Sequence, residues 1–212
     1  MDPADSRRDA RAAEGVGVRP GWCSLFAYTD FRLPEVLAMT DRPAMPAVYA
    51  ALAEDEARND LIFDDVLLAL DAKRSPIVLT ERRDHLEYLQ SRFSKFVKNL
   101  AVLRGGMSAG DRRTNEAVMA VPDDEERLIV ATGRYIGEGF DDPRLDTLFL
   151  TMPISWRGTL AQYVGRLHRQ RDGKSDVLVV DYVDANAPML ARMAAKRRTG
   201  YRALGYSFEQ TN

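Results

Sequence analysis

The sequence predicts an α/β fold in which helices flank a parallel sheet. Short apolar runs alternate, roughly five times along the chain, with longer stretches whose apolar residues follow a helical period. The run Pro76–Thr80 (PIVLT) is apolar throughout, as expected for a strand that is covered on both faces. Strands that alternate with helices in this way are joined by right-handed crossovers.

Length and charge limit the classes of protein to consider. A chain of 212 residues is long enough for one sizeable domain with extensions. Its 30 basic and 32 acidic residues give a net charge of −2, which is not the strongly basic balance of a free-standing DNA-binding protein. Any contact with nucleic acid must therefore come from a local cluster.

Cysteine content and hydropathy indicate the compartment. The single cysteine, Cys23, excludes an internal disulfide and a cysteine metal site, and it suits a reducing environment. No apolar run approaches the length of about 18 residues that a membrane helix needs, and no signal peptide is visible. We expect a cytoplasmic protein without a membrane segment and without a metal site.

The first third of the chain predicts a leader, a strand and two helical pieces. Residues 1–20 are rich in Arg, Asp, Ala and Gly and lack an apolar period, so we expect a flexible leader before a domain that spans 21–212. Trp22–Tyr28 predicts a short edge strand or, alternatively, a packed loop. Phe31–Pro46 contains three prolines and predicts a loop. Pro46–Ala72 predicts a helix in two pieces with an apolar stripe.

The middle of the chain predicts two strands, each followed by a helix. After the apolar run that ends at Thr80, Asp84 is a candidate N-cap for a helix that continues through Phe96. His85 lies near the start of this helix and is interpreted as a surface or capping residue, because no ligand or triad partner is near it in the sequence. Leu100–Leu103 predicts the next strand.

Gly105 and Gly106 follow this strand and precede a predicted helix. Backbone N–H groups at the positive end of a helix favour a phosphate, and a plain strand-to-helix turn is the alternative. The two glycines are therefore candidate phosphate contacts.

The second half of the chain predicts three more strands and two helices. Leu128–Ala131 stops at the polar residue Thr132, and a loop with glycines and acids leads to Leu145–Thr151. The last strand is Asp176–Tyr182. The final helix, Pro188–Tyr206, carries a basic cluster that we interpret as a solvated face. This cluster comprises Lys196, Arg197, Arg198 and Arg202.

The helix Ala161–Arg169 (AQYVGRLHR) predicts two chemically different sides at about 100° per residue. The apolar side holds Leu160, Val164 and Leu167, and the polar side holds Gln162, Arg166 and Arg169. Two guanidinium groups on one rigid face suit a polyphosphate, and a surface helix with solvated arginines is the alternative. A strand, a Gly-rich acidic turn, a second strand and this helix together predict a site at the carboxyl ends of parallel strands.

Two stretches also carry a family resemblance. ATGRYIGEGFDDP (131–143) and QYVGRLHR (162–169) resemble motifs V and VI of superfamily-two helicases of the DEAD/DEAH-box and restriction-enzyme type. The resemblance covers roughly Pro46–Val183 and implies the second, C-terminal RecA-like domain of such an enzyme. The parallel sheet predicted above fits a RecA-like domain.

The resemblance implies a role in ATP hydrolysis for the motif VI helix. Arg169 matches the arginine finger, which stabilises the transferred phosphoryl group, and Arg166 matches its γ-phosphate partner. Gln162 matches a further ATP-contacting position. Asp141, together with Gly139, matches the motif V position that contacts the ribose, although the adjacent Asp142 leaves open which carboxylate does so.

Other matching positions imply contacts with the nucleic-acid backbone. These are Thr80 in the place of motif IV, Gly105 and Gly106 in a Gly-Gly-Met stretch, and Thr132 and Gly133 at a strand end. Two departures from the DEAD-box pattern, Gln162 in place of His and Tyr163 in place of a second Arg, favour a DNA-type enzyme over an RNA-type one.

Two elements of a complete motor are missing. The only Gly-Lys-Ser, residues 173–175, precedes a strand and has His168 where the first glycine of a P-loop belongs. No Asp-Glu-Ala-Asp-like box ends a strand. The chain therefore lacks the lysine that grips the phosphates and the carboxylates that hold Mg²⁺, and we expect it not to hydrolyse ATP alone. ATP and Mg²⁺ would be bound mainly by an N-terminal RecA-like domain, in the same or a partner chain.

Two hypotheses follow. The first is the C-terminal motor domain of an ATP-dependent DNA helicase or translocase, as a fragment or a naturally split subunit. The second is a non-catalytic RecA-like module that binds nucleic acid or a partner protein. A Rossmann cofactor enzyme is disfavoured because no G-x-G-x-x-G follows the first strand.

Overall fold

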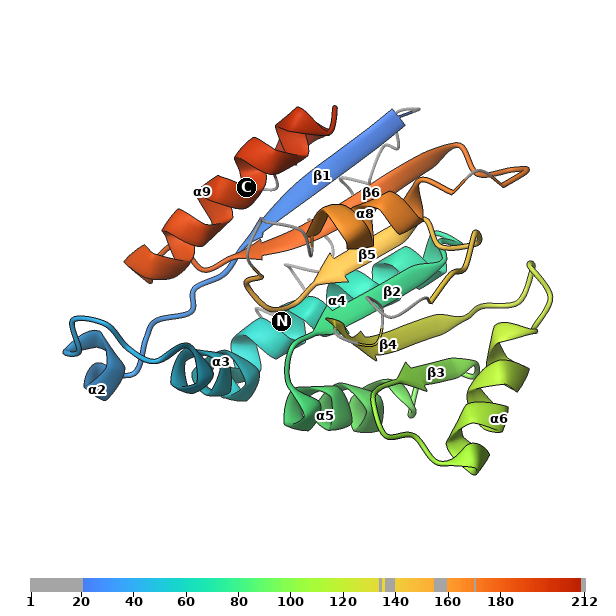
Figure 1. Cartoon of the computed structure of the whole chain (residues 1–212), viewed down its shortest axis with the longest axis horizontal. Coiled ribbons are helices and arrows are strands. Elements are labelled where there is room, and N and C mark those ends of the chain that lie inside the picture. The colour runs from blue at the N-terminus through green and yellow to red at the C-terminus, as the bar shows by residue number, and fades with distance from the viewer. Residues whose placement is uncertain (1–20, 134, 136–139, 155–159, 170, 211–212) are drawn as a thin grey trace, which may run out of the picture.

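The computed structural model describes residues 21–133, 135, 140–154, 160–169 and 171–210, so the expected leader (1–20) lies outside the described residues. Within them, seven strands form one sheet in the order β3-β4-β2-β5-β6-β1-β7, and all pairs are parallel (Figure 1). The predicted α/β architecture is confirmed. The strands are β1 (Gly21–Tyr28), β2 (Pro76–Thr80), β3 (Leu100–Leu103), β4 (Leu128–Thr132), β5 (Thr147–Leu150), β6 (Asp176–Val183) and β7 (Ser207–Gln210). The helices are α2 (Glu35–Ala38), α3 (Met45–Glu54), α4 (Glu56–Asp71), α5 (Arg83–Phe93), α6 (Ala109–Met119), α8 (Ala161–Leu167) and α9 (Pro188–Ala203).

Helices cover both faces of the sheet, which explains why its central strands are apolar throughout. Val78 of β2 packs into a core with α4 and α5. Its neighbours Ile77 and Leu79 point the other way, into a core with α8 and α9. Because successive side chains of a strand alternate between faces, a strand buried on both sides needs apolar residues at every position. No helix in the described part of the chain is long and apolar enough to cross a membrane.

The first strand is an interior strand, which corrects the expectation of an edge strand or loop. β1 pairs with β6 on one side and with β7 on the other. β7 itself was not predicted, because the last helix was expected to continue through Tyr206. Instead, α9 ends at Ala203, and Gly205 turns the chain with φ +87°. A glycine with positive φ just past a helix end is a common helix stop.

Three local expectations are also corrected. The predicted loop 31–46 contains the short helix α2 and the first residues of α3. Helix α5 ends at Phe93 rather than Phe96, and its N-cap position is Arg82. Asp84 lies inside the first turn, where its carboxylate accepts the N–H of His85 and pairs with Arg82.

A buried ion pair joins α9 to the sheet. Nε and Nη2 of Arg197 each donate a hydrogen bond of 2.7 Å to the Asp181 carboxylate, and the two side chains are 1% and 0% exposed. The hydroxyl of Tyr201 donates a third hydrogen bond to the same carboxylate, at 3.3 Å. Arg197 therefore does not belong to the solvated basic cluster that the sequence predicted.

Replacing Arg197 with Ala should lower the free energy of unfolding by about 3–5 kcal/mol, because it leaves the Asp181 carboxylate buried without its partner. Urea unfolding followed by circular dichroism measures the loss. The matched control is Glu87→Ala, which breaks a pair with Arg83 whose side chains are 54% and 67% exposed and should cost less than about 0.5 kcal/mol. A loss for Arg197→Ala no larger than that of the control would contradict the role of the buried pair.

Candidate functional site

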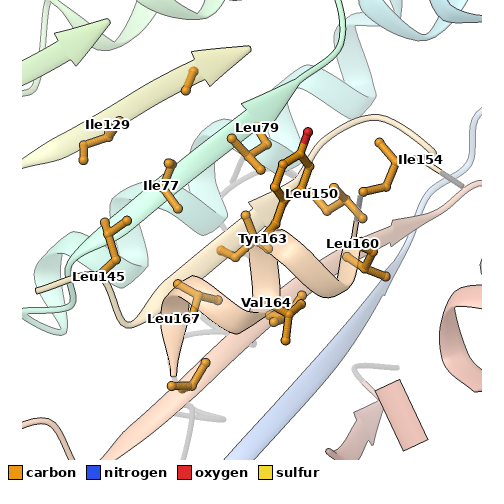
Figure 2. Close-up of a cluster of buried hydrophobic side chains, with 14 of the residues drawn as sticks. Ile77, Leu79, Ile129, Leu145, Leu150, Ile154, Leu160, Tyr163, Val164 and Leu167 are labelled. Atoms are coloured by element: carbon orange, nitrogen blue, oxygen red, sulfur yellow. The ribbon is translucent and has the colours of Figure 1, made fainter. Parts of the chain in front are cut away.

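Helix α8 lies across the sheet with its apolar side against the strands (Figure 2). Leu160, Val164 and Leu167 are buried, as predicted, and Tyr163 is buried with them. Gln162 is exposed and Arg166 is half-buried, so both are accessible on the outer side of the helix. The helix ends at Leu167, and Arg169 lies in the following turn rather than on the predicted helical face.

The direction of α8 separates the candidate residues into two groups. The helix follows β5 and leads back to the start of β6. It therefore runs from the carboxyl-terminal ends of the strands, here called the carboxyl edge, to their amino-terminal ends, here called the amino edge. Figure 2 shows Tyr163 near Leu79 and Leu150 at the ends of their strands, and Leu167 near Leu145, which precedes β5. The expectation of one site at the carboxyl ends of the strands is therefore corrected: the candidates lie at both edges.

The amino-edge group brings motif V and motif VI residues together. Nε of Arg169 lies 3.1 Å from the Asp141 carboxylate, and the two side chains are 57% and 40% exposed. Within the described residues Arg166 has no ion-pair partner. The predicted site residue Gly139 lies outside the described residues.

The neighbouring acids Asp141 and Asp142 have different environments. Asp142 is buried, where it pairs with Arg127 and accepts the N–H of Arg144. Asp141 faces solvent with Arg169. Of the two carboxylates between which the sequence could not choose, Asp141 is the one accessible to a ligand.

The carboxyl-edge group lies where β2 and β4 end side by side. Thr80 pairs with Thr132 in the sheet, and Gly133 follows directly. A Cβ atom on Gly133 would overlap both the carboxylate of Glu81 and the hydroxyl of Tyr163. Burial, and next the nearby Glu81, raise the pKa of Tyr163 above its ordinary value. Gly133 is thus a point of close approach between β2, β4 and α8, which the sequence did not show.

Thr80 begins a buried chain of hydrogen bonds that also corrects the interpretation of His85. The His85 ring is 1% exposed; its Nδ1 lies 2.9 Å from the Thr80 hydroxyl and its Nε2 lies 2.9 Å from Oδ1 of Asn59. The amide of Asn59 donates to the Ala53 carbonyl, so Oδ1 is the acceptor. It follows that Nε2 carries the proton and that the Thr80 hydroxyl donates to Nδ1. His85 is a structural residue with two partners, not a surface residue.

Gly105 and Gly106 are exposed in the loop between β3 and α6. Gly106 has φ +73°, and nothing lies within 4 Å of a Cβ built on either glycine. Helix α6 starts three residues later, and its first turn is closed by a capping box in which Ser108 and Asp111 exchange hydrogen bonds. The two glycines therefore lie ahead of the helix rather than at its first turn. In the described part of the chain no cluster of three or more His, Cys, Asp or Glu side chains could hold a metal ion.

Comparisons with known proteins place this geometry in context. The transcript termination protein A18 of vaccinia virus (strain Ankara) is 28% identical over 123 residues, which are 57% of this chain and 24% of that protein. The protein of the same name from Yaba-like disease virus is 26% identical over 132 residues, 61% of this chain and 27% of that protein. The matched region thus spans about a quarter of the length of these relatives. No protein-family model matches the chain.

Two solved structures resemble the fold. T4 UvsW superposes with a TM-score of 0.65 at 16% identity, covering 91% of this chain and 41% of that one. The C-terminal part of the Fun30 ATPase domain superposes with a TM-score of 0.55 at 14% identity, covering 68% and 46%. The chain therefore has a RecA-like fold.

Stability should depend on pH through His85. Burial, and next the charge of Arg58, lower the pKa of His85 from 6.5 to about 3. Between these pH values the unfolded chain binds a proton that the folded chain excludes. The contribution of neutral His85 to the free energy of unfolding is therefore complete above pH about 6.5. It is lost as the pH falls, by up to about 1.4 kcal/mol per pH unit. Urea unfolding at pH about 7 and at pH about 5.5 gives the two free energies of unfolding from which the slope with pH is obtained. His85→Gln should be less stable at neutral pH and show a slope smaller by this amount; equal slopes would contradict a neutral buried His85.

Gly133→Ala should lower the free energy of unfolding by about 1–3 kcal/mol, because the added methyl displaces Glu81 and Tyr163. Adding Tyr163→Phe should restore part of the loss, since it removes one of the overlapping atoms. The control is Gly165→Ala in α8, where nothing lies within 4 Å of an added Cβ atom. This substitution should stabilise the helix by about 0.5–1 kcal/mol. Urea unfolding of the three variants and the parent measures these differences, and an unchanged stability of Gly133→Ala would contradict the close approach.

Proposed function

We propose that this chain is the second, C-terminal RecA-like motor domain of an ATP-dependent helicase or translocase that acts on DNA. The observation that carries the proposal is the meeting of Arg169 with Asp141 at the amino edge, just after Arg166 in the last turn of α8. Gln162 lies one helical turn before Arg166, on the same accessible side of the helix. Residues from two separate motifs come together there on an accessible surface. The proposed domain spans 21–212.

The electrostatics of this edge suit a phosphate that arrives from outside the chain. The Arg169–Asp141 pair is partly exposed, and such pairs contribute at most about 1 kcal/mol, so a phosphate can replace Asp141 as the partner of Arg169 at little cost. Arg166 adds a second guanidinium, and Gln162 adds an amide that can donate or accept. Released from Arg169, the Asp141 carboxylate is free to accept a ribose hydroxyl.

ATP with Mg²⁺ fits this chain only in part. Arg166 and Arg169 can hold the terminal phosphate, and Gln162 is one helical turn before Arg166, whereas the described residues offer no carboxylate cluster for the metal ion. A first RecA-like domain, upstream in the same chain or in a partner chain, would hold the metal and the remaining phosphates. Bound ATP would supply the phosphoryl group, and Arg169 would stabilise the charge that develops on it.

The carboxyl edge is the proposed path of the nucleic-acid strand. Thr132 and Gly133 lie at the end of β4, beside Thr80, and the exposed Gly105 and Gly106 offer backbone N–H groups next to β3. Contacts of this kind reach the phosphate backbone and are independent of sequence. The buried Thr80 hydroxyl is already bonded to His85, so Thr80 would contribute through its main chain.

The comparisons support a place inside a larger protein. One structural neighbour is described as an ATPase domain, and the curated relatives are transcript termination proteins about four times longer than the matched region. We therefore propose that the N-terminal motor half lies outside the 212 residues, and that the cleft between the halves closes on ATP.

Arg169→Ala and Arg166→Ala should each lower kcat for ATP hydrolysis by about 10³-fold or more in the motor assembled from this chain and the half that carries the P-loop. Arg192→Ala, which removes an exposed arginine from α9, is the control and should hydrolyse ATP normally. DNA-stimulated and RNA-stimulated hydrolysis are measured side by side, and we expect DNA to be the stronger activator. Full activity of both arginine variants, with nucleic-acid binding retained, would establish the alternative of a non-catalytic binding module.

A further inference from the structure

The Gly-Lys-Ser stretch that is not a P-loop, residues 173–175, forms a tight turn just before β6. The N–H of Lys174 donates to the carbonyl of Arg171 at 3.1 Å, and Gly173 adopts φ +84°. A positive φ at the third position of such a turn favours glycine, because glycine carries no Cβ atom. The turn places Lys174 at the amino edge of the sheet, where its half-buried side chain lines a cavity together with Arg169.

The Lys174 ammonium joins the two segments that carry the candidate phosphate site. It donates to the carbonyl of Arg169 at 3.2 Å and to the carbonyl of Pro143 at 3.4 Å. Arg169 lies in the turn after α8, and Pro143 follows Asp141 by two residues in the segment before β5. One side chain therefore bridges the main chains of motif VI and motif V, next to the point where Arg169 meets Asp141.

The local charges favour this use of Lys174. The Arg169 carbonyl lies just past the end of α8, where the helix dipole attracts a cation. Burial lowers the pKa of Lys174, whereas the nearby carboxylates of Asp146 and Asp142 raise it. Among the described residues no carboxylate lies within ion-pair distance of the ammonium, so its hydrogen bonds hold the main chain rather than an acid.

The turn after α8 is also anchored on its other side. Nε2 of His168 lies 2.7 Å from the Tyr206 hydroxyl, and the His168 ring packs edge-on against Trp22 with the centroids 3.9 Å apart. These contacts tie the turn to β1 and to the residue before β7. Lys174 supplies the link in the other direction, to the loop that carries Asp141.

The Lys174 bridge and the Arg169–Asp141 pair respond differently to a phosphate. The pair joins two partly exposed side chains, and a phosphate can replace Asp141 in it. The bridge ends on two main-chain carbonyls and does not involve the Arg169 guanidinium. It can therefore persist after the pair has opened, when Arg169 no longer has Asp141 to hold it.

We propose that Lys174 is a positioning residue for Arg169, because its bridge between the Arg169 and Pro143 carbonyls keeps the arginine in place when a phosphate replaces Asp141 as its partner. The proposal rests on the proposed function, in which Arg169 acts on that phosphate. A donor that is held in advance stabilises developing charge without the cost of reorganisation. A displacement of about 1 Å can lower a rate by about 10²-fold.

A double-variant cycle in the assembled motor tests the proposal. Lys174→Met, which keeps an unbranched apolar side chain, should lower kcat for ATP hydrolysis by about 10–100-fold and change KM far less, because the loss falls on the transition state. In the Arg169→Ala background the same substitution should have no further effect, since Lys174 acts through Arg169. An equal loss in both backgrounds would overturn the proposal, because Lys174 would then act on the phosphate directly or on stability alone.

Two further variants complete the cycle. Lys174→Arg should retain most of the activity, since the adjoining cavity of about 450 Å³ has room for a larger side chain that can donate to both carbonyls. Lys196→Met removes an exposed lysine from α9 and is the matched control, which should behave like the parent. A parental kcat for Lys174→Met would also overturn the proposal.

Hydrogen exchange of the 212-residue chain alone separates this proposal from the proposed function. In Lys174→Met the amides of 141–146 and 166–169 should exchange about 10-fold faster than in the parent, with no change in β2 and β4. Unchanged exchange in the two segments would overturn the bridge, and faster exchange throughout the sheet would show a general loss of stability and overturn the positioning role. Full motor activity of Arg169→Ala would reject the arginine-finger role, and local acceleration in Lys174→Met would still establish the bridge.

Discussion

The parallel direction of all seven strands determines where everything else lies. Each strand that is followed by another must be joined to it by a segment that returns to the amino-terminal ends of the strands, and the helices that cover both faces lie in these returning segments. Because α8 is such a return, its two ends lie at opposite edges. Tyr163 approaches Gly133 at the carboxyl edge, while Arg169, just past the other end, meets Asp141. One short rigid element thus links the proposed strand contacts to the proposed nucleotide contacts.

Strand β6 holds helices on both faces through charge as well as through apolar packing. Asp181, within the strand, binds Arg197 of α9, and Asp184, just after it, binds Arg58 of α4 at 2.9 Å. The two positions are three residues apart, so their side chains leave the strand on opposite faces. Thr29, which follows β1, donates to Asp184 at 2.6 Å and joins the neighbouring strand end to this network. Pairs that are this deeply buried favour one arrangement of the helices, because another arrangement would leave a buried charge without its partner.

Local patterns predicted most of the fold and only part of the site. The apolar runs located six of the seven strands, whereas β7 (SFEQ) has too little apolar character to stand out from the end of a helix. The two-sided pattern of α8 identified Leu160, Val164 and Leu167 as buried, but it did not show that the helix ends before Arg169. What local patterns missed depends on distant partners: Asn59 bonds His85 from 26 positions away, and Glu81 meets Gly133 only because β2 and β4 are neighbours. Likewise, Thr132 and Asp141 are close in sequence but lie at opposite ends of the strands, because Thr132 ends β4 whereas Asp141 precedes β5.

The interior position of β1 has a consequence for synthesis of the protein. This strand is made first among the seven, yet both of its neighbours, β6 and β7, are made last. Thr29 and its partner Asp184 are 155 positions apart, which at ribosomal speeds corresponds to a delay of roughly 8–30 s. During this interval a strand with two unpaired edges leaves the ribosome ahead of its partners. Residues 21–28 are therefore synthesised well before either of the strands that pair with them, and both strand edges stay unpaired until the end of the sheet has been translated.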